Sequence, residues 1–486
     1  MSSRLPPQGR PRDEVLAELR TYGTHDPDFK SGRLWSLVYH LGDAHDDFMG
    51  EAYQAFSSAN GLNPTAFKSL KRFETETIDS VAELFHGTPG TCGVVTSGGT
   101  ESCLLAVKTY RDMARARGVK RPEMVLTPTA HVAWFKAAEY FDVKPRLLPL
   151  DVGLRADVRK LPGLVNRRTV MVLGSAPGYP HGTIDLIAAM GAICQQRKVP
   201  LHVDACVGGF ILPFMEMNGR ALPLWDYRVP GVTSISADIH KYGYAAKGAS
   251  TITYRSLDIL RHQMFVSQDW PGGVFASPAL LGTRPGGAYA AAWAAMQHFG
   301  VSGYRDLAAT TLQAFDAMRA GVAAMPELAV LGEPTGPLLG YASRDPQVNI
   351  FAVGDQMDAL GWKVNRLQRP DGLHAMVTAA HLPVVADYLR DLAQAVATVK
   401  ANPALAKEGS AATYGMMSHI PLRGMVRSKV LDLFVQMYQP GGQEIDLHAA
   451  PTAAPGLRGR LDAMADRLAR WYVERQQRRQ HKGPPG

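Results

Sequence analysis

Cysteine is scarce in this chain of 486 residues, which contains four: Cys92, Cys103, Cys194 and Cys206. None of them forms a Cys-x-x-Cys pair, so the sequence indicates neither a disulfide framework nor a paired-thiol metal site. The chain also lacks a His-Glu-x-x-His motif, and His40, His45 and the acids near them lack metal-ligand spacing, so we expect no metal. This cysteine usage favours a reducing, cytoplasmic setting.

Long apolar runs are missing as well. No run approaches the roughly 18 apolar residues that a membrane span needs. The first residues, MSSRLPPQGRPRDEV, lack the apolar core of a signal peptide. We therefore expect a soluble protein with at most peripheral membrane contact.

Charge of one sign is not concentrated in the body of the chain. Lys and Arg number 52 and Asp and Glu 44, which gives a net charge of +8. Residues 467–486 hold six basic residues against Glu474, so 6 − 1 = +5 of this excess lies in the tail. The near-neutral remainder argues against nucleic-acid binding. We interpret the tail as an exposed helix end, with weak membrane-surface contact as the alternative.

Strand-like and helix-like segments alternate between about residues 75 and 325, which is typical of a largely parallel sheet covered on both faces. The sequence therefore predicts a large α/β domain over 76–325, preceded by an N-terminal arm and helical segment over 1–75. The expected strands are 91–96, 124–126, 146–150, 169–173, 201–204 and 233–237, and the expected helices are 100–118, 131–141 and 185–197.

The pattern changes after Pro326, and we expect a smaller C-terminal α+β domain over 326–486 that ends in the basic tail. Its expected strands are 348–353 and 374–378. Its expected helices are 356–360, 383–399, 422–438 and 457–477.

The stretch Ser97-Gly-Gly-Thr-Glu-Ser102 lies between an expected strand and an expected helix. Glycines allow close backbone approach, and the free N–H groups at a helix start bind phosphate. The alternative is a plain helix cap at Thr100, with glycine for the turn.

Asp204 ends the expected strand Leu201–Asp204, where ligands of parallel sheets bind. An acid there can pair with a cationic ring nitrogen, although a salt-bridged or capping Asp is the alternative. Lys241 follows another strand, and a lysine kept out of bulk water has a lowered pKa and can form an imine with an aldehyde. The alternative interpretation is that Lys241 is an ordinary surface lysine. Pyridoxal 5'-phosphate requires an anchor for its phosphate, an anion for its ring nitrogen and an amine for its aldehyde. The stretch Ser97–Ser102, called the phosphate loop from here on, Asp204 and Lys241 match these three requirements.

With these motifs in place, the chain resembles the fold-type I pyridoxal-phosphate enzymes of the group II decarboxylase superfamily, and within them the sphingosine-1-phosphate lyases. The resemblance covers roughly residues 30–440. It rests on the stretches VTSGGTESCLLAVKTYRD (95–112), PLHVDACVGGF (200–210), GVTSISADIHKYGYAAKG (231–248), DWPGGVFASPALLGTRPGG (269–287) and AATYGMM (411–417).

The resemblance implies that Lys241 forms the imine with the cofactor, that Asp204 pairs with the ring nitrogen, and that His131 stacks on the ring. It implies a homodimer, because Gly282 and Thr283 match residues that reach the neighbour's cofactor phosphate. It implies that the remaining cofactor contacts are Gly98, Gly99, Thr100, Cys206 and His240.

Substrate contacts are implied for Tyr39, Lys247 and Asn63, and Tyr414 matches a tyrosine on a loop that reaches the site. Asn63 stands where relatives carry a phosphate-contacting histidine, and an asparagine cannot carry a positive charge.

The implied reaction cleaves a phosphorylated long-chain 2-amino-3-hydroxy base by retro-aldol chemistry, giving an aldehyde and phosphoethanolamine. The alternatives are an amino-acid decarboxylase and an aldolase that acts on an unphosphorylated β-hydroxy amino acid.

Overall fold

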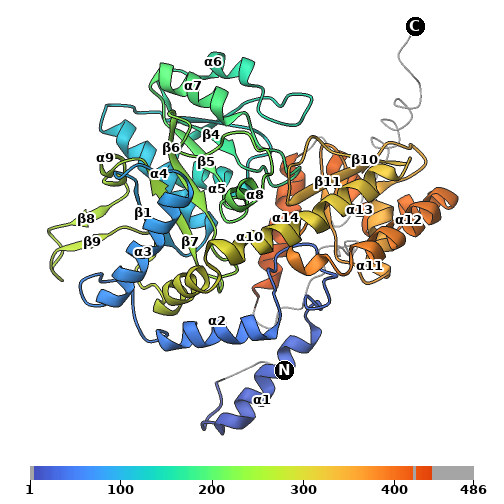
Figure 1. The fold of residues 1–486 in the computed structure, drawn as a ribbon, viewed down its shortest axis with the longest axis horizontal. Helices are drawn as coiled ribbons and strands as arrows, with labels where there is room; N and C mark the ends of the chain where they lie inside the picture. The colour runs from blue at the N-terminus through green and yellow to red at the C-terminus, as the bar shows by residue number, and fades with distance from the viewer. Residues whose placement is uncertain (1–4, 420–422, 440–486) are drawn as a thin grey trace, which may run out of the picture.

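The computed structural model describes residues 5–419 and 423–439. Figure 1 shows a large part built around a central sheet and a smaller part formed by the C-terminal elements. The expected helix at 457–477 and the basic tail lie outside the described residues.

The central sheet has seven strands in the order β1-β7-β6-β5-β4-β2-β3. All pair in parallel except β7, which runs antiparallel to both β1 and β6. The predicted large, mostly parallel sheet is therefore confirmed. The strands are β1 (Cys92–Thr96), β2 (Glu123–Leu126), β3 (Lys144–Leu147), β4 (Thr169–Ser175), β5 (Leu201–Asp204), β6 (Val232–Ala237) and β7 (Ser250–Tyr254).

Helices cover both faces of this sheet (Figure 1). Met124 and Leu126 of β2 join a core with α4 (Gly99–Arg115) and α5 (Val132–Phe141). Val125, which points to the opposite face, joins the core that includes α7 (Ile187–Arg197) and α8 (Leu212–Met217). Because alternate residues of the inner strands are buried on opposite faces, most of β2 and most of β4 read as continuous apolar runs.

The remaining elements of the first 325 residues surround the central sheet and its helices. The longest of them, α10 (Gly286–Ala324), bends at Gly300, where φ is 53°. These elements are α1 (Arg12–Tyr22), α2 (Asp43–Ala55), α3 (Lys68–Leu84), α6 (Leu161–Leu164), α9 (Leu257–Leu260), the hairpin β8 (Phe265–Ser267) and β9 (Phe275–Ser277), and α10 (Gly286–Ala324).

The smaller domain is an antiparallel sheet in the order β10-β11-β13-β12 with helices packed on it. Its core also takes Trp35 from the N-terminal segment and the end of α10. Its elements are β10 (Leu328–Val330), β11 (Leu338–Ser343), β12 (Asn365–Leu367), β13 (Gly372–Met376), α11 (Ile350–Ala359), α12 (Val385–Ala401) and α13 (Gly409–His419). Helix α14 (Arg423–Met437) is the last described element of the chain.

The strand predicted at 348–353 is wrong, because helix α11 begins there. Asn349 caps this helix: its Oδ1 accepts hydrogen bonds from the backbone N–H groups of Phe351 and Ala352, each at 3.0 Å. The capping bonds satisfy donors at the start of the helix, which the apolar pattern alone did not reveal.

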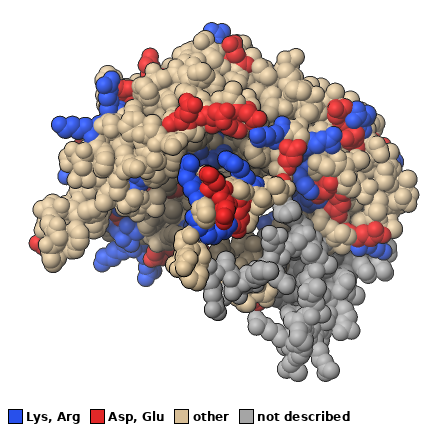
Figure 2. Space-filling model, turned by 90° about the horizontal axis from the view of Figure 1, so that it is seen from below, with Lys and Arg blue, Asp and Glu red and all other residues tan. Residues whose placement is uncertain are grey.

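No helix among the described residues is long and apolar enough to cross a membrane. On the face shown in Figure 2, basic and acidic side chains are interspersed, and several of them gather around a hollow near the middle of the view. The mixed charge on this face matches the near-neutral body of the sequence.

Candidate active site

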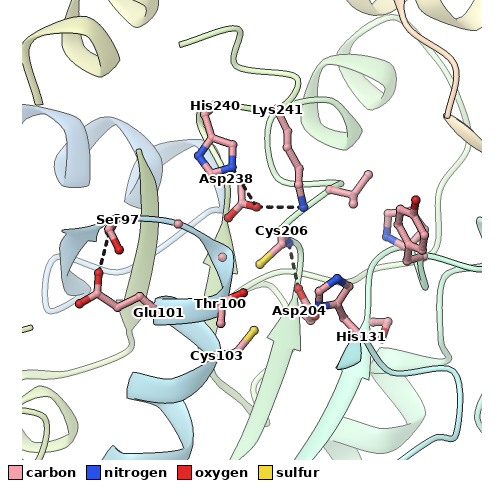
Figure 3. Close-up of a pocket in the computed structure, with 16 residues that line it drawn as sticks. Ser97, Thr100, Glu101, Cys103, His131, Asp204, Cys206, Asp238, His240 and Lys241 are labelled. Carbon is pink, nitrogen blue, oxygen red and sulfur yellow. Dashed lines mark hydrogen bonds and ion pairs between the residues drawn. The ribbon is translucent and has the colours of Figure 1, made fainter. Parts of the chain in front are cut away.

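A cavity of about 390 Å³ opens at the carboxyl edge of the central sheet (Figure 3). Its walls come from the loops that follow β1, β2, β4, β5 and β6, so segments far apart in the sequence meet there. This edge is where parallel α/β sheets bind ligands. It brings together many of the predicted site residues: Gly98, Gly99, Thr100, His131, Asp204, Cys206, His240 and Lys241.

The phosphate loop turns from β1 into α4, a helix of 17 residues. A side chain at Gly99 would place its Cβ 2.7 Å from Asp238 Oδ2, so only glycine, which has no side chain, fits at this position of the loop. Glu101 fixes the loop: its carboxylate accepts from the Ser97 N–H at 2.7 Å and from the Leu280 N–H at 2.8 Å. The helix start thus presents backbone donors to the cavity, as an anion site requires.

Asp204 ends β5 with a buried carboxylate. Trp134 Nε1 donates to Oδ2 at 2.7 Å, and the Cys206 N–H donates to Oδ1 at 3.0 Å. The Trp134 ring in turn lies 4.8 Å from the buried His202 ring. The Ser236 hydroxyl also donates to Oδ1, at 3.5 Å, so neutral donors hold this carboxylate in place without cancelling its charge.

His131 begins α5, and its ring lines the cavity near Asp204 (Figure 3). Nδ1 accepts from the Ala133 N–H at 3.3 Å, which caps the helix. The ring meets that of Tyr179 edge to face at 6.2 Å. Burial lowers the pKa of His131, and the positive charge of Lys241 adds to this, so the imidazole is mostly neutral near pH 7.

Lys241 lies across the cavity, and its Nζ is 2.9 Å from Asp238 Oδ2. We predicted a lowered pKa for this lysine, and that prediction is wrong. Burial is the largest single influence and opposes the ammonium form, but the charge and hydrogen bond of Asp238 together with Tyr39 and Cys206 outweigh it, and the pKa of Lys241 is raised. His240 Nε2 lies 3.6 Å from the same carboxylate oxygen. Burial raises the pKa of Asp238, but Lys241 and His240 outweigh it, so the net shift is downward.

The donors of this cavity fit pyridoxal phosphate, which needs an anion for its ring nitrogen, an amine for its aldehyde and a cradle for its phosphate. Asp204, Lys241 and the start of α4 supply these three. His240 Nδ1 is also buried with no hydrogen-bond partner among the described residues, so a donor or acceptor beside the loop is still available.

Tyr39 and Lys247 line a neighbouring cavity of about 580 Å³. Lys247 Nζ lies 4.9 Å from the centre of the Tyr39 ring and donates to the His240 carbonyl at 3.1 Å. His240 also lines the catalytic cavity, so the two cavities adjoin at this residue. Burial, together with the charge of Lys241, lowers the pKa of Lys247 to about 8.

Four predicted residues line neither of these two cavities. Asn63 and the Gly282–Thr283 pair are exposed, and Asn60, near Asn63, donates to Thr283 Oγ1 at 3.3 Å. Tyr414 packs in the smaller domain, 5.9 Å from the Phe351 ring. The roles predicted for these four residues remain predictions.

The reasoning from sequence missed three residues that line the cavity, Asp238, Glu101 and Tyr179, and also Trp134, which lies behind it and donates to Asp204. Asp238 carried a usable signal, since it lies directly after a strand and three residues before Lys241. Trp134 carried none, because its bond to Asp204 joins residues 70 positions apart.

Comparison with known proteins places the chain in a family. Residues 50–342 match the pyridoxal-dependent decarboxylase conserved domain. The chain is 41% identical to a sphingosine-1-phosphate lyase of Arabidopsis thaliana over 87% of this chain and 79% of the plant protein. It is 39% identical to sphingosine-1-phosphate lyase 1 of Rattus norvegicus over 87% of this chain and 74% of the rat protein.

Comparison with solved structures leads to the same family. A sphingosine-1-phosphate lyase of Burkholderia pseudomallei superposes with a TM-score of 0.81 at 39% identity, covering 89% of this chain and 97% of that one. A glutamate decarboxylase of Lactobacillus brevis shares the fold, with a TM-score of 0.72 at 21% identity over 82% of this chain and 95% of the other. From the motifs, the cavity and these matches, the chain belongs to the sphingosine-1-phosphate lyase family of pyridoxal-phosphate-dependent enzymes.

Proposed function

We propose that this protein is a carbon–carbon lyase that cleaves a phosphorylated long-chain 2-amino-3-hydroxy base into an aldehyde and phosphoethanolamine. One observation carries the proposal: a single cavity combines Lys241, Asp204 and the glycine-containing phosphate loop. A second cavity, lined by Lys247, adjoins it. Relatives named sphingosine-1-phosphate lyases support the substrate class.

Pyridoxal phosphate, when bound, supplies an aldehyde that condenses with an amine and a ring that takes up the electron pair left by bond cleavage. In this chain Lys241 would hold the aldehyde carbon, and Gly98, Gly99, Thr100 and His240 would hold the phosphate. Asp204 would keep a proton at the ring nitrogen, and Trp134 and the Cys206 N–H keep that carboxylate aimed into the cavity.

Two side chains are placed to move protons. His131 is mostly neutral near pH 7 because its pKa is lowered, so Nδ1, once it releases the 3.3 Å hydrogen bond from the Ala133 N–H, can accept the proton that leaves the C3 hydroxyl group. Lys241 carries a proton beside Asp238 and is placed to deliver one to the substrate Cα. His131 would therefore act as the base and Lys241 as the acid.

Decarboxylation and aldol cleavage of an unphosphorylated substrate are the competing reactions, because the same cofactor site serves all three. The test is product analysis with a phosphorylated long-chain base, its dephosphorylated form, phenylserine and an aromatic amino acid. We expect aldehyde from the phosphorylated base at the highest kcat/KM. Carbon dioxide from the amino acid at a higher kcat/KM would overturn the proposal.

We also propose a homodimer in which each subunit completes its partner's site. This rests on the exposed Gly282 and Thr283, which are tied to the segment around Asn60 by the bond to Thr283 Oγ1. The hairpin β8–β9 adds exposed apolar side chains just before them in sequence, with Phe265 and Trp270 each 57% exposed.

Subunit mixing tests this arrangement. Lys241→Ala and Thr283→Asp subunits should each be inactive alone. Reassociated dimers should recover about a quarter of the wild-type activity, because half of them are heterodimers with one intact site. No recovery, in mixtures shown to contain heterodimer, would contradict sharing, as would an active monomer in sedimentation.

A cytoplasmic location is a further proposal. It is supported by the low cysteine count and by the four cysteines being unpaired in the structure. Cell fractionation with an antibody to the native chain would test it, and recovery in an envelope or secreted fraction would contradict it.

A further inference from the structure

A row of buried polar side chains lies behind Asp204, and the proposed reaction does not use it. We propose that His202 is a positioning residue for the cofactor: through Ser236 and Trp134 it fixes the Asp204 carboxylate where that group meets the ring nitrogen of pyridoxal phosphate. The inference rests on the role proposed for Asp204 and is independent of which substrate bond is cleaved. His202, Ser236 and Trp134 do not line the cavity, so they act through Asp204 and not on the substrate.

The register of two parallel strands sets this row. His202 and Asp204 are alternate residues of β5, so they point to the same face of the sheet. Their neighbours on β6 are Ser234 and Ser236, respectively. All four side chains are buried, in the layer where α4 and α5 pack apolar residues against the sheet. Polar groups in such a layer cost stability unless each of them is hydrogen-bonded.

Both nitrogens of the His202 imidazole are engaged. Nδ1 lies 2.7 Å from Ser234 Oγ, and Nε2 lies 3.1 Å from Ser236 Oγ. The Tyr110 hydroxyl of α4 donates to Ser234 Oγ at 2.6 Å, and the Ser236 hydroxyl donates to Asp204 Oδ1 at 3.5 Å. These bonds form one chain that starts at Tyr110, passes through the imidazole and ends on the carboxylate.

The two ends of this chain imply one tautomer of His202. Ser234 accepts from Tyr110, so its own hydrogen is available to Nδ1, and Nε2 then carries the ring hydrogen toward Ser236. Burial lowers the pKa of His202 to about 4, although the charge of Asp204 opposes this shift, so the ring is neutral near pH 7. Every donor of the chain therefore points toward Asp204, and none carries a positive charge that would offset the carboxylate.

The other carboxylate oxygen depends on His202 through packing. Trp134 Nε1 donates to Asp204 Oδ2 at 2.7 Å, and the indole ring lies 4.8 Å from the imidazole at a tilt of 58°. His202 thus contacts both side chains that donate to Asp204. The Ser236 contact of 3.5 Å is long for an O–H···O hydrogen bond, so the ring contact with Trp134 carries part of the restraint.

This arrangement holds a negative charge at one place in a site screened from water. Groups that are fixed in advance stabilise an opposite charge without the cost of reorganisation. Without the imidazole, Ser236 and the indole lose the neighbour that orients them, and the Asp204 carboxylate is free to turn away from the ring nitrogen. A purely structural imidazole would instead affect stability alone, and the site would respond to the ring nitrogen as before.

The test titrates the full chain, freed of cofactor, with two ligands: pyridoxal phosphate and its analogue with carbon in place of the ring nitrogen. Both carry the same aldehyde and phosphate, so the ratio of their Kd values isolates the ring nitrogen. We expect His202→Leu to weaken the Kd for pyridoxal phosphate about tenfold and Ser236→Ala by a smaller factor, with an unchanged Kd for the analogue. The double variant should match His202→Leu, because Ser236 acts through the same chain.

His381→Leu is the matched control. His381 is also a buried imidazole with both nitrogens engaged, by Thr378 Oγ1 at 3.0 Å and the Leu34 carbonyl oxygen at 3.2 Å, and it lines neither cavity. Its replacement should lower the melting temperature and leave the ratio of the two Kd values at the wild-type level.

Equal weakening for both ligands in His202→Leu would show a structural role and overturn the inference, as would an unchanged Kd for pyridoxal phosphate. Ser236→Ala, which changes the core least, gives the same test if His202→Leu does not fold. A wild type that binds the two ligands equally well would refute the role of Asp204 itself, and the inference with it.

Discussion

Lys241 and Asp238 form an ion pair within one turn of chain, with Nζ 2.9 Å from Oδ2; the carboxylate is buried, whereas the lysine side chain is 24% exposed. Asp238 also lies against Gly99 of the phosphate loop, where a Cβ would come within 2.7 Å of its carboxylate. One acid therefore controls the charge of the amine and the shape of the phosphate cradle. Its other oxygen, Oδ1, is buried without a hydrogen-bond partner among the described residues.

Replacing Asp238 with Asn should lower the pKa of Lys241. The carboxylate is the main influence that raises this pKa, whereas burial lowers it. Because an imine forms from the neutral amine, covalent capture of added pyridoxal phosphate should reach its half-maximum at a lower pH than in the wild type. Visible absorbance across a pH series measures this. An unchanged midpoint in a folded variant would show that Asp238 does not set the charge of Lys241.

Asp204→Asn should reduce kcat by about 10²-fold or more while weakening cofactor binding far less. The carboxylate stabilises a protonated ring nitrogen, which an amide cannot do in a site screened from water. Trp134→Phe is the matched control, because it removes only a neutral donor to the same oxygen and should cost much less. Near-normal kcat in Asp204→Asn would rule out the assigned role.

Lys241→Ala should abolish turnover in a folded protein that still binds the cofactor non-covalently. In the wild type, borohydride reduction followed by peptide mapping should place the label on Lys241. Lys247 is the internal control, because its lower pKa makes it the more nucleophilic amine near pH 8. A label on Lys247 would show that Lys247, and not Lys241, forms the imine with the cofactor.

The pKa of Lys247 predicts a pH dependence of substrate binding. Since burial lowers this pKa to about 8, the ammonium is present below that pH and is lost as the pH rises through it. The KM for a phosphorylated base should therefore rise above about pH 8, while the KM for the dephosphorylated base changes little. Parallel pH profiles for the two substrates would contradict a charged Lys247 at the phosphate.

Much of the fold and the cofactor site could be predicted because the evidence is local in the sequence. Asp204 ends a short strand, the phosphate loop and Lys241 each follow one, and the carboxyl ends of parallel strands share one edge of the sheet. The strands β7 to β12 were missed, of which β7 and β11 are the longest. Small and polar residues interrupt their apolar pattern, and pairing with neighbouring strands, distant in sequence, determines them instead.

The charge of Lys241 could not be predicted from burial alone. The lowered pKa followed from desolvation, and the opposing effect of Asp238 depends on a turn geometry that the sequence does not state. The same holds for Trp134, whose hydrogen bond fixes Asp204 across two elements. Such contacts depend on tertiary packing, which residue patterns do not encode directly.

The proposed cleavage is tested most directly by product stoichiometry. The holoenzyme is incubated with a phosphorylated long-chain base, with the Lys241→Ala variant as the control, and both fragments are quantified by mass spectrometry. The account predicts aldehyde and phosphoethanolamine in equal amounts from the wild type and neither from the variant. Recovery of intact substrate from the wild type, or an amine product without a matching aldehyde, would contradict carbon–carbon cleavage by this site.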